Sequence, residues 1–393
     1  MVYLAGMLDA WRAHVKHAVG WLVAALGVVG CSGDPELSSG PGSGGSGGAQ
    51  ATGAGGAGGA SSGGGGLGGN GGTGGTGGQG GTGGACEPGG FAPQPEPYPV
   101  TIAGQKAWVH DEGFSSGYFH TYDELTLPGP DERPRKVHVL LPRDYTETCD
   151  RYPVVYMNDG ETTFWPGGPG NKSWSVAQGL EGLYSEGAIP PVMVVAVHAI
   201  DRNYEYSHTA WAPDVECCGV ESYADYLADS VKGFIDANYR TAPEPEKTAI
   251  VGSSRGGLCS FVVANLRPDS FRKAGCLSPS FWLGLEPVWG GDFPGGPLAT
   301  SKLLDMTKGT LSNPSQKPTL WIDWGLVFTG GFHNEVIEKN AAQYGQEMVT
   351  LLQADYGYAV GQDLFWMEDP AGEHDEISWA KRFPLVMKAF FGD

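Results

Sequence analysis

Basic residues are scarce in this sequence: 24 lysines and arginines stand against 44 aspartates and glutamates, a formal net charge of −20. A surface this acidic repels nucleic acid and anionic lipid headgroups, so we expect no nucleic-acid partner. The C-x-x-C spacing and the H-E-x-x-H motif are both missing, so we expect no metal and no cofactor. Long apolar runs are missing too. The longest, residues 18–30, is too short to span a bilayer.

The N-terminus has the features of an export signal. Arg12 and Lys16 precede the apolar run 18–30, whose length fits the hydrophobic part of a signal peptide. The run ends in Val-Val-Gly before Cys31, which resembles the bacterial lipobox, whose cysteine is lipidated after cleavage. We therefore expect residues 1–31 to be a lipoprotein signal peptide, and the protein to be exported and lipid-anchored to the bacterial cell envelope. An ordinary secretory signal is the alternative.

Residues 32–85 are predicted to be a flexible tether. They are rich in glycine, serine, threonine and alanine and have almost no bulky apolar side chains to bury. Residues 86–393 differ in composition, because most of the 12 tryptophans, 16 tyrosines and 15 phenylalanines lie there. That many aromatic residues exclude a disordered chain, and the length suits one large α/β domain.

The cysteines other than Cys31 are even in number, which favours disulfides in an exported chain. A Cys259–Cys276 bridge is one possibility, because the two residues flank consecutive elements, and two buried thiols are the other. Cys217 and Cys218 are adjacent, so we expect them to bond to separate partners rather than to each other.

The folded part alternates apolar strands with amphipathic helices. Strands are predicted over residues 122–127, 136–141, 152–157, 192–197, 248–252, 319–323 and 364–367. Helices are predicted over 175–185, 223–237, 256–266, 335–354 and 378–391. Apolar runs without alternation, flanked by helices, indicate a mostly parallel sheet covered on both faces. Loops 158–174, 198–222 and 282–301 leave the carboxyl ends of strands, where open α/β sheets bind ligands.

Ser254 is the candidate nucleophile. Gly252 and Gly256 flank it in the pattern G-x-S-x-G, directly after an apolar strand and at the start of a helix. Small residues at these positions permit a sharp strand-to-helix turn that exposes the serine hydroxyl. The helix dipole and the next amide then face the same point in space. Because a serine hydroxyl is a poor nucleophile alone, the motif also requires a base.

His374 is the candidate base. In hydrolases of this kind the histidine follows the nucleophile in chain order, on the loop after the last strand. Among the nine histidines, His374 meets both conditions, because it lies between the predicted strand 364–367 and the final helix. The alternative is a surface or helix-capping histidine.

With these residues in place, the sequence resembles the Putative esterase family of the α/β-hydrolase superfamily, which includes siderophore (enterobactin-type) esterases, feruloyl esterases and mycolyltransferases. The resemblance covers roughly residues 120–392 and lies in the segments 152–160, 249–257, 276–282 and 374–379. It implies an α/β-hydrolase fold, with Ser254 as nucleophile, His374 as base, and the amides of Glu161 and Arg255 as the oxyanion hole. Methionine is common in the family where this chain has Arg255. The guanidinium either attracts an acidic or catechol-bearing substrate or pairs with a nearby carboxylate.

The acid that would complete a Ser–His–acid triad is where the sequence departs from the family pattern. Family members usually place an acid about three residues after the glycine of the loop that corresponds to Gly325, but no carboxylate occurs there. Glu335 at the start of the next predicted helix ranks first as the acid. A Ser–His dyad without an acid ranks second, and Asp323 before the glycine ranks third.

The resemblance implies an extracytoplasmic serine carboxylic-ester hydrolase that works through an acyl-enzyme. Its expected substrate is a siderophore, a feruloyl ester or another small ester or acylated glycan. Two other functions fit the same sequence: an acyltransferase on the same Ser–His machinery, and a catalytically silent surface-binding module.

Overall fold

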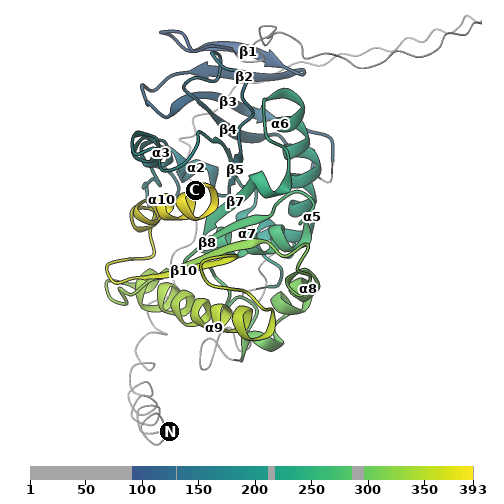
Figure 1. Ribbon diagram of the computed structural model, residues 1–393, viewed down its shortest axis with the longest axis vertical. Helices are drawn as coiled ribbons and strands as arrows, with labels where there is room; N and C mark the ends of the chain where they lie inside the picture. Colours follow the sequence, from purple (N-terminus) through teal and green to yellow (C-terminus); the bar gives the residue numbers. More distant parts are fainter. Residues whose placement is uncertain (1–90, 130, 211–216, 286–295, 393) are drawn as a thin grey trace, which may run out of the picture. The chain divides into compact units, whose positions relative to one another are not determined.

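A single mixed sheet organises the part of the chain that the computed structural model describes, residues 91–129, 131–210, 217–285 and 296–392. Within these residues the sheet has ten strands in the order β1-β2-β3-β4-β6-β5-β7-β8-β9-β10 (Figure 1). The strands are β1 (Tyr98–Ile102), β2 (Gln105–His110), β3 (Gly117–Leu125), β4 (Arg135–Pro142), β5 (Val154–Met157), β6 (Met193–Val197), β7 (Thr248–Ser253), β8 (Lys273–Leu277), β9 (Thr319–Gly325) and β10 (Leu364–Asp369). β1 to β4 pair in antiparallel fashion, and β4 is antiparallel to β6. All further pairings are parallel.

Helices cover both faces of the sheet, as the apolar strands require. In β5, Val154 and Tyr156 join one apolar core, and Val155 and Met157 join the other. α3 and α10 cover the face with Val155, whereas α5 to α9 pack on the face with Val154 (Figure 1). The predicted α/β-hydrolase-like architecture, a mostly parallel sheet between two helical layers, is therefore confirmed.

The five predicted helices are present, together with further helices and short helical turns that were not predicted. They are α2 (Gly160–Thr163), α3 (Val176–Ser185), α4 (Arg202–Glu205), α5 (Val220–Asp225), η2 (Tyr226–Lys232), α6 (Gly233–Asn238), η3 (Pro245–Lys247), α7 (Arg255–Leu266), η4 (Leu298–Thr300), α8 (Lys302–Leu311), η5 (His333–Glu338), α9 (Lys339–Asp355) and α10 (Glu376–Phe391). The helices predicted over 223–237 and 335–354 each contain a wider, π-type turn, η2 and η5. Such turns are frequent at functional sites, and η5 contributes a residue to the site described below.

Three strands were not predicted. β1 is half-exposed and contains a proline, and β2 alternates exposed with buried residues. Neither strand therefore has the continuous apolar run from which the other strands were predicted. β8 has the sequence Lys-Ala-Gly-Cys-Leu, in which small residues hide the apolar pattern. β8 matters because it lies between β7 and β9 and connects two parts of the site.

The expectation of separate partners for Cys217 and Cys218 is wrong, and of the two possibilities left open for Cys259 and Cys276 the structure has the buried thiols. Cys217 and Cys218 are bonded to each other, and Cys259 and Cys276 are buried free thiols. Cys149 is disulfide-bonded as well. The signal peptide 1–31 with Cys31, and the tether 32–85, lie outside the described residues. No helix within the described ranges has the length and apolarity needed to cross a bilayer.

Candidate active site

Ser254 occupies a sharp turn between β7 and α7. Its backbone has φ 55° and ψ −122°, a strained conformation for a residue with a side chain. The Ser254 amide donates to the Leu277 carbonyl at 2.9 Å, which ties the turn to the end of β8. The turn brings the flanking glycines so close together that Gly252 has no room for a side chain. A Cβ on Gly252 would lie 2.5 Å from the Gly256 carbonyl oxygen. The predicted strand-to-helix turn is therefore present.

A buried carboxylate holds His374. The Oε2 atom of Glu338, from η5, lies 2.5 Å from Nδ1 of His374, and the Glu338 side chain is fully buried. The His374 amide donates to the Asn334 side-chain oxygen at 2.9 Å, and Trp379 packs against the imidazole edge to face at 5.1 Å. A carboxylate on Nδ1 keeps the proton on that nitrogen and leaves Nε2 as the basic atom.

The other Glu338 oxygen is also fully used. Oε1 accepts a hydrogen bond from the Ser278 hydroxyl at 2.8 Å and another from the Gly325 amide. The Ser278 hydroxyl in turn accepts from Trp379 Nε1 at 3.1 Å and from an Arg382 Nη2 at 2.8 Å. A carboxylate with this many donors is stabilised as an anion and is fixed in direction.

The prediction that Glu335 is the acid partner of His374 is wrong. Glu335 is exposed and accepts a hydrogen bond from the Gly331 amide at 3.2 Å, so it serves the start of its own helix. Glu338 lies about one turn further along and faces inward. The Ser–His dyad is wrong for the same reason, because His374 does have a carboxylate partner. The sequence offered a weak signal for Glu338: two glutamates at three-residue spacing on one helix, without a way to choose between them.

Asp323, the third choice for the acid, has a different role. It is fully buried at the end of β9, where it accepts from Trp321 Nε1 at 2.8 Å and pairs with Arg382 Nε at 3.2 Å. Burial raises the pKa of Asp323 to about 6, against the opposing effect of Arg382. Asp323 also accepts from the Ser278 amide at 3.2 Å, so it supports the residue that orients Glu338.

The loop after β8 contacts both Ser254 and the Glu338–His374 pair. Ser278 contacts Glu338 as described, and two residues later the Ser280 hydroxyl lies 3.4 Å from the Ser254 hydroxyl. The Ser280 amide also donates to the Ser254 carbonyl at 3.0 Å. Ser254 and His374 therefore lie at the carboxyl edge of one sheet. The loop that links them follows β8, a strand that was not predicted.

The residues predicted for the oxyanion hole come from adjacent strands. Glu161 lies in the first turn of α2, just after β5, and Arg255 opens α7 after β7. The two strands are neighbours, since the Asn158 amide bonds to the Val251 carbonyl at 3.0 Å. A Cβ on Gly256 would lie 2.9 Å from Asp159 Oδ2, so the α2 turn approaches the start of α7 closely. Two helix N-termini thus converge near Ser254.

Charged side chains surround this turn. Arg202 binds both oxygens of Asp159, with Nε–Oδ1 at 2.6 Å and Nη2–Oδ2 at 2.9 Å. The Arg255 guanidinium donates to the Asn203 side-chain oxygen, and burial together with Arg202 lowers the pKa of Arg255 to about 10. Burial and the Asp159 carboxylate raise the pKa of Glu161 to about 7. The site therefore combines two guanidinium groups with a carboxyl group that titrates near neutrality.

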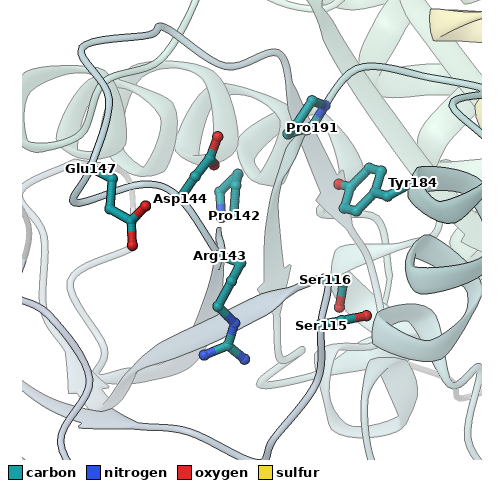
Figure 2. A pocket seen from close by; sticks show the side chains of 8 residues that line it. All are labelled: Ser115, Ser116, Pro142, Arg143, Asp144, Glu147, Tyr184 and Pro191. Carbon is teal, nitrogen blue, oxygen red and sulfur yellow. The ribbon is translucent and has the colours of Figure 1, made fainter.

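A small pocket at the other edge of the sheet is separate from these residues. Figure 2 shows the residues that line it, Ser115, Ser116, Pro142, Arg143, Asp144, Glu147, Tyr184 and Pro191, of which Pro142 ends β4 and Pro191 lies shortly before β6. Because β4 is antiparallel to β6, Pro142 lies beside the amino end of the parallel strands, whereas Ser254 lies at the carboxyl end. None of its lining residues belongs to the predicted site.

Comparison with known proteins gives matches to esterases. The family model described as "Putative esterase" matches residues 131–384. The chain is 25% identical over 155 residues to the uncharacterized protein YbbA of Bacillus subtilis (strain 168), covering 38% of this chain and 58% of that protein. It is 27% identical over 150 residues to the endo-1,4-beta-xylanase/feruloyl esterase of Xylanibacter ruminicola, covering 36% of this chain and 19% of the relative.

The chain also resembles solved structures at low sequence identity. The enterobactin esterase of Shigella flexneri is 18% identical with a TM-score of 0.47, covering 69% of this chain and 57% of that chain. This chain thus spans less than two thirds of the length of each of these three proteins.

Proposed function

Because the chain belongs to the family described as "Putative esterase", we propose that it is a serine carboxylic-ester hydrolase with Ser254 as nucleophile, His374 as base and Glu338 as acid. The observation that carries the proposal is the buried Glu338–His374 pair, at 2.5 Å, on the same sheet edge as the strained Ser254 turn. A serine on such a turn and a histidine oriented by a carboxylate are the parts that nucleophilic acyl transfer requires.

In the proposed reaction His374 Nε2 takes the proton of the Ser254 hydroxyl as its oxygen attacks the ester carbonyl. Glu338 stabilises the imidazolium that forms, without taking its proton. The amides of Glu161 and Arg255 donate to the oxyanion, each contributing about 3 kcal/mol of transition-state stabilisation. His374 then protonates the departing alcohol, leaving an acyl group on Ser254. Water activated by the same histidine releases the acid and restores the serine.

The proposed substrate is a small acylated ester such as a feruloyl or siderophore ester. The relative that is 27% identical is described as an endo-1,4-beta-xylanase/feruloyl esterase, which supports an aromatic acyl group. Arg202 and Arg255 near the serine would favour an acyl or alcohol part that carries negative charge or phenolic oxygens. We also propose that the protein is exported and lipid-anchored through Cys31, on the sequence of its N-terminus.

Hydrolysis of p-nitrophenyl acetate and butyrate tests the activity. The wild-type protein should turn over both esters, and Ser254→Ala and His374→Ala should reduce kcat by at least about 10³-fold. A fluorophosphonate probe should label the wild type and not Ser254→Ala. A folded wild-type protein that neither reacts with the probe nor hydrolyses these esters would contradict the proposal and favour a silent binding module. A product in which an added alcohol replaces water would instead identify an acyltransferase.

A further inference from the structure

A line of hydrogen-bonded histidines runs through the antiparallel part of the sheet. The Nε2 atom of His110 lies 2.8 Å from the Thr121 hydroxyl, and the same hydroxyl lies 2.9 Å from Nδ1 of His138. The Nε2 atom of His138 lies 3.1 Å from Nε2 of His198. The line therefore crosses from β2 through β3 and β4 to the residue that follows β6, and three links in sequence have hydrogen-bond distances.

The two ends of the line differ. At one end His110 Nδ1 bonds at 2.9 Å to Glu112, whose side chain is exposed to solvent. At the other end His198 Nδ1 lies 4.0 Å from Glu161 Oε2, an oxygen that is buried and has no hydrogen-bond partner. A distance of 4.0 Å is too long for a hydrogen bond, which requires the Glu161 carboxyl to approach His198 by about 1 Å. The line thus leads from the surface to the turn that carries a proposed oxyanion amide.

The three hydrogen bonds that join His110, Thr121, His138 and His198 can all point in either of two directions, and the fourth link forms when Glu161 approaches His198. With Glu161 protonated, its hydroxyl points to His198 Nδ1, His198 Nε2–H donates to His138, and His138 Nδ1–H donates to Thr121. The Thr121 hydroxyl then donates to His110 Nε2. If each proton moves one step along, Glu161 becomes a carboxylate, the donors all point toward it, and His110 becomes an imidazolium. One proton is transferred overall, and no group gains or loses another.

Burial keeps the middle of the line neutral, as such a transfer requires. Burial lowers the pKa of His138 to about 3 and that of His198 to about 4, and the nearby cation Lys136 adds to both effects. Two neutral imidazoles joined through Nε2 share a single proton, so the tautomer of one sets that of the other. Further charges that face the line are Asp111 near His110, Arg135 and Asp159 near His198, and Asp159, Arg202 and Glu376 near Glu161.

We propose that this line exchanges a proton with the Glu161 carboxyl and so makes Glu161 a titrating positioning residue for the oxyanion turn. The proposal rests on the proposed function, because it concerns the amide of the same residue. When Glu161 is neutral, the two amides stabilise the oxyanion without opposition. When Glu161 is a carboxylate, its negative charge repels the negative charge that develops on the oxyanion. The line stabilises the carboxylate by turning its donors toward it, and thereby holds the Glu161 ionisation near neutral pH.

The pH dependence of kcat/KM for p-nitrophenyl butyrate tests the role of Glu161. The wild type should give a bell-shaped profile. Its descending limb reports ionisation of Glu161, and kcat/KM should fall by about tenfold by pH 9. Glu161→Gln should remove that limb. His138→Phe cuts the line and fills the space beside Trp165, so it should move the limb upward by about half a pH unit or more. His120→Phe removes another buried histidine, on the neighbouring strand β3 and outside the line, and should leave the limb in place.

A titration without catalysis separates this proposal from the proposed function. In Ser254→Ala protein labelled with ¹³C at glutamate carboxyls, the Glu161 signal is identified by its loss in Ser254→Ala/Glu161→Gln. Its midpoint should rise when His138→Phe is added and should stay unchanged when His120→Phe is added. Equal midpoints in all three backgrounds would overturn the relay, even in an active esterase. If the midpoint shifts as expected but the wild-type protein has no esterase activity, the result would support the relay and contradict the proposed function.

Discussion

Glu338 Oε2 lies 2.5 Å from His374 Nδ1, and a hydroxyl from neither of their elements binds the other oxygen of the carboxylate. Ser278, from the loop after β8, donates its hydroxyl proton to Glu338 Oε1 and receives bonds from Trp379 and Arg382 of α10. Glu338 comes from η5 and His374 from the loop after β10. The acid–base pair is therefore assembled from several segments distant in sequence, around one buried hydroxyl.

Replacing Glu338 tests its assignment directly. Glu338→Gln should lower kcat for p-nitrophenyl esters by about 10²- to 10⁴-fold, because an amide neither favours the Nδ1–H tautomer nor stabilises the imidazolium. Glu335→Gln is the matched control, three residues earlier on the same helix and exposed, and should stay within about twofold of wild type. Steady-state kinetics of both variants decide the point. A Glu335→Gln loss as large as that of Glu338→Gln would return the role to Glu335.

Ser278 should matter for both stability and rate. Ser278→Ala leaves Glu338, Trp379 and Arg382 each without one buried hydrogen-bond partner, so we expect unfolding free energy to fall by about 1–3 kcal/mol. The rate constant kcat should fall as well, because Glu338 loses one of its fixed donors. Urea unfolding and ester kinetics measure the two effects. Ser312→Ala, at an exposed helix end, is the control and should change stability by less than about 0.5 kcal/mol.

Two glycine-to-alanine changes should have opposite effects. Gly256→Ala places a methyl group 2.9 Å from Asp159 Oδ2, a carboxylate that Arg202 holds in place, so we expect lower stability and a large loss of kcat. Gly309→Ala lies in α8 with no atom within 4 Å of the added group, so we expect a gain of about 0.5–1 kcal/mol and unchanged activity. Thermal unfolding with kinetics checks both. Wild-type activity in Gly256→Ala would mean that the α2 turn adjusts freely.

Stability should fall in mild acid because of buried histidines. Burial lowers the pKa of His120 and of His208 to about 4, below the unfolded value of about 6.5. Between these values the unfolded chain binds more protons, so stability is full above about pH 6.5 and is lost as the pH falls toward 4. Each histidine should cost about 2 kcal/mol at pH 5. Urea unfolding at pH 7 and pH 5 measures the loss, which should be smaller in His120→Phe than in the wild type. An equal loss in both proteins would contradict this account of His120.

Much of the fold could be read from the order of apolar runs. The runs that became β5, β6, β7 and β9 are apolar because their residues alternate between two cores, and both cores are covered. The first two strands, β1 and β2, were not predicted because one side of each is exposed, and β8 was not predicted because it contains small residues. The family and the fold class predicted from these runs and from the Ser254 motif are confirmed. The export signal with Cys31 and the tether 32–85 stay predictions.

Positions with local conformational requirements could be assigned from the amino-acid sequence. A serine between Gly252 and Gly256 after a strand has few other conformations open to it, and His374 follows the last strand in chain order. The tertiary structure alone decided which glutamate meets His374, because Glu335 and Glu338 differ only in the direction that their helix gives them after a long loop. It also decided that His110, Thr121, His138 and His198 form one line, since strand pairing brings them together from across 88 residues of chain. Contacts between distant segments depend on register and packing, which no local pattern encodes.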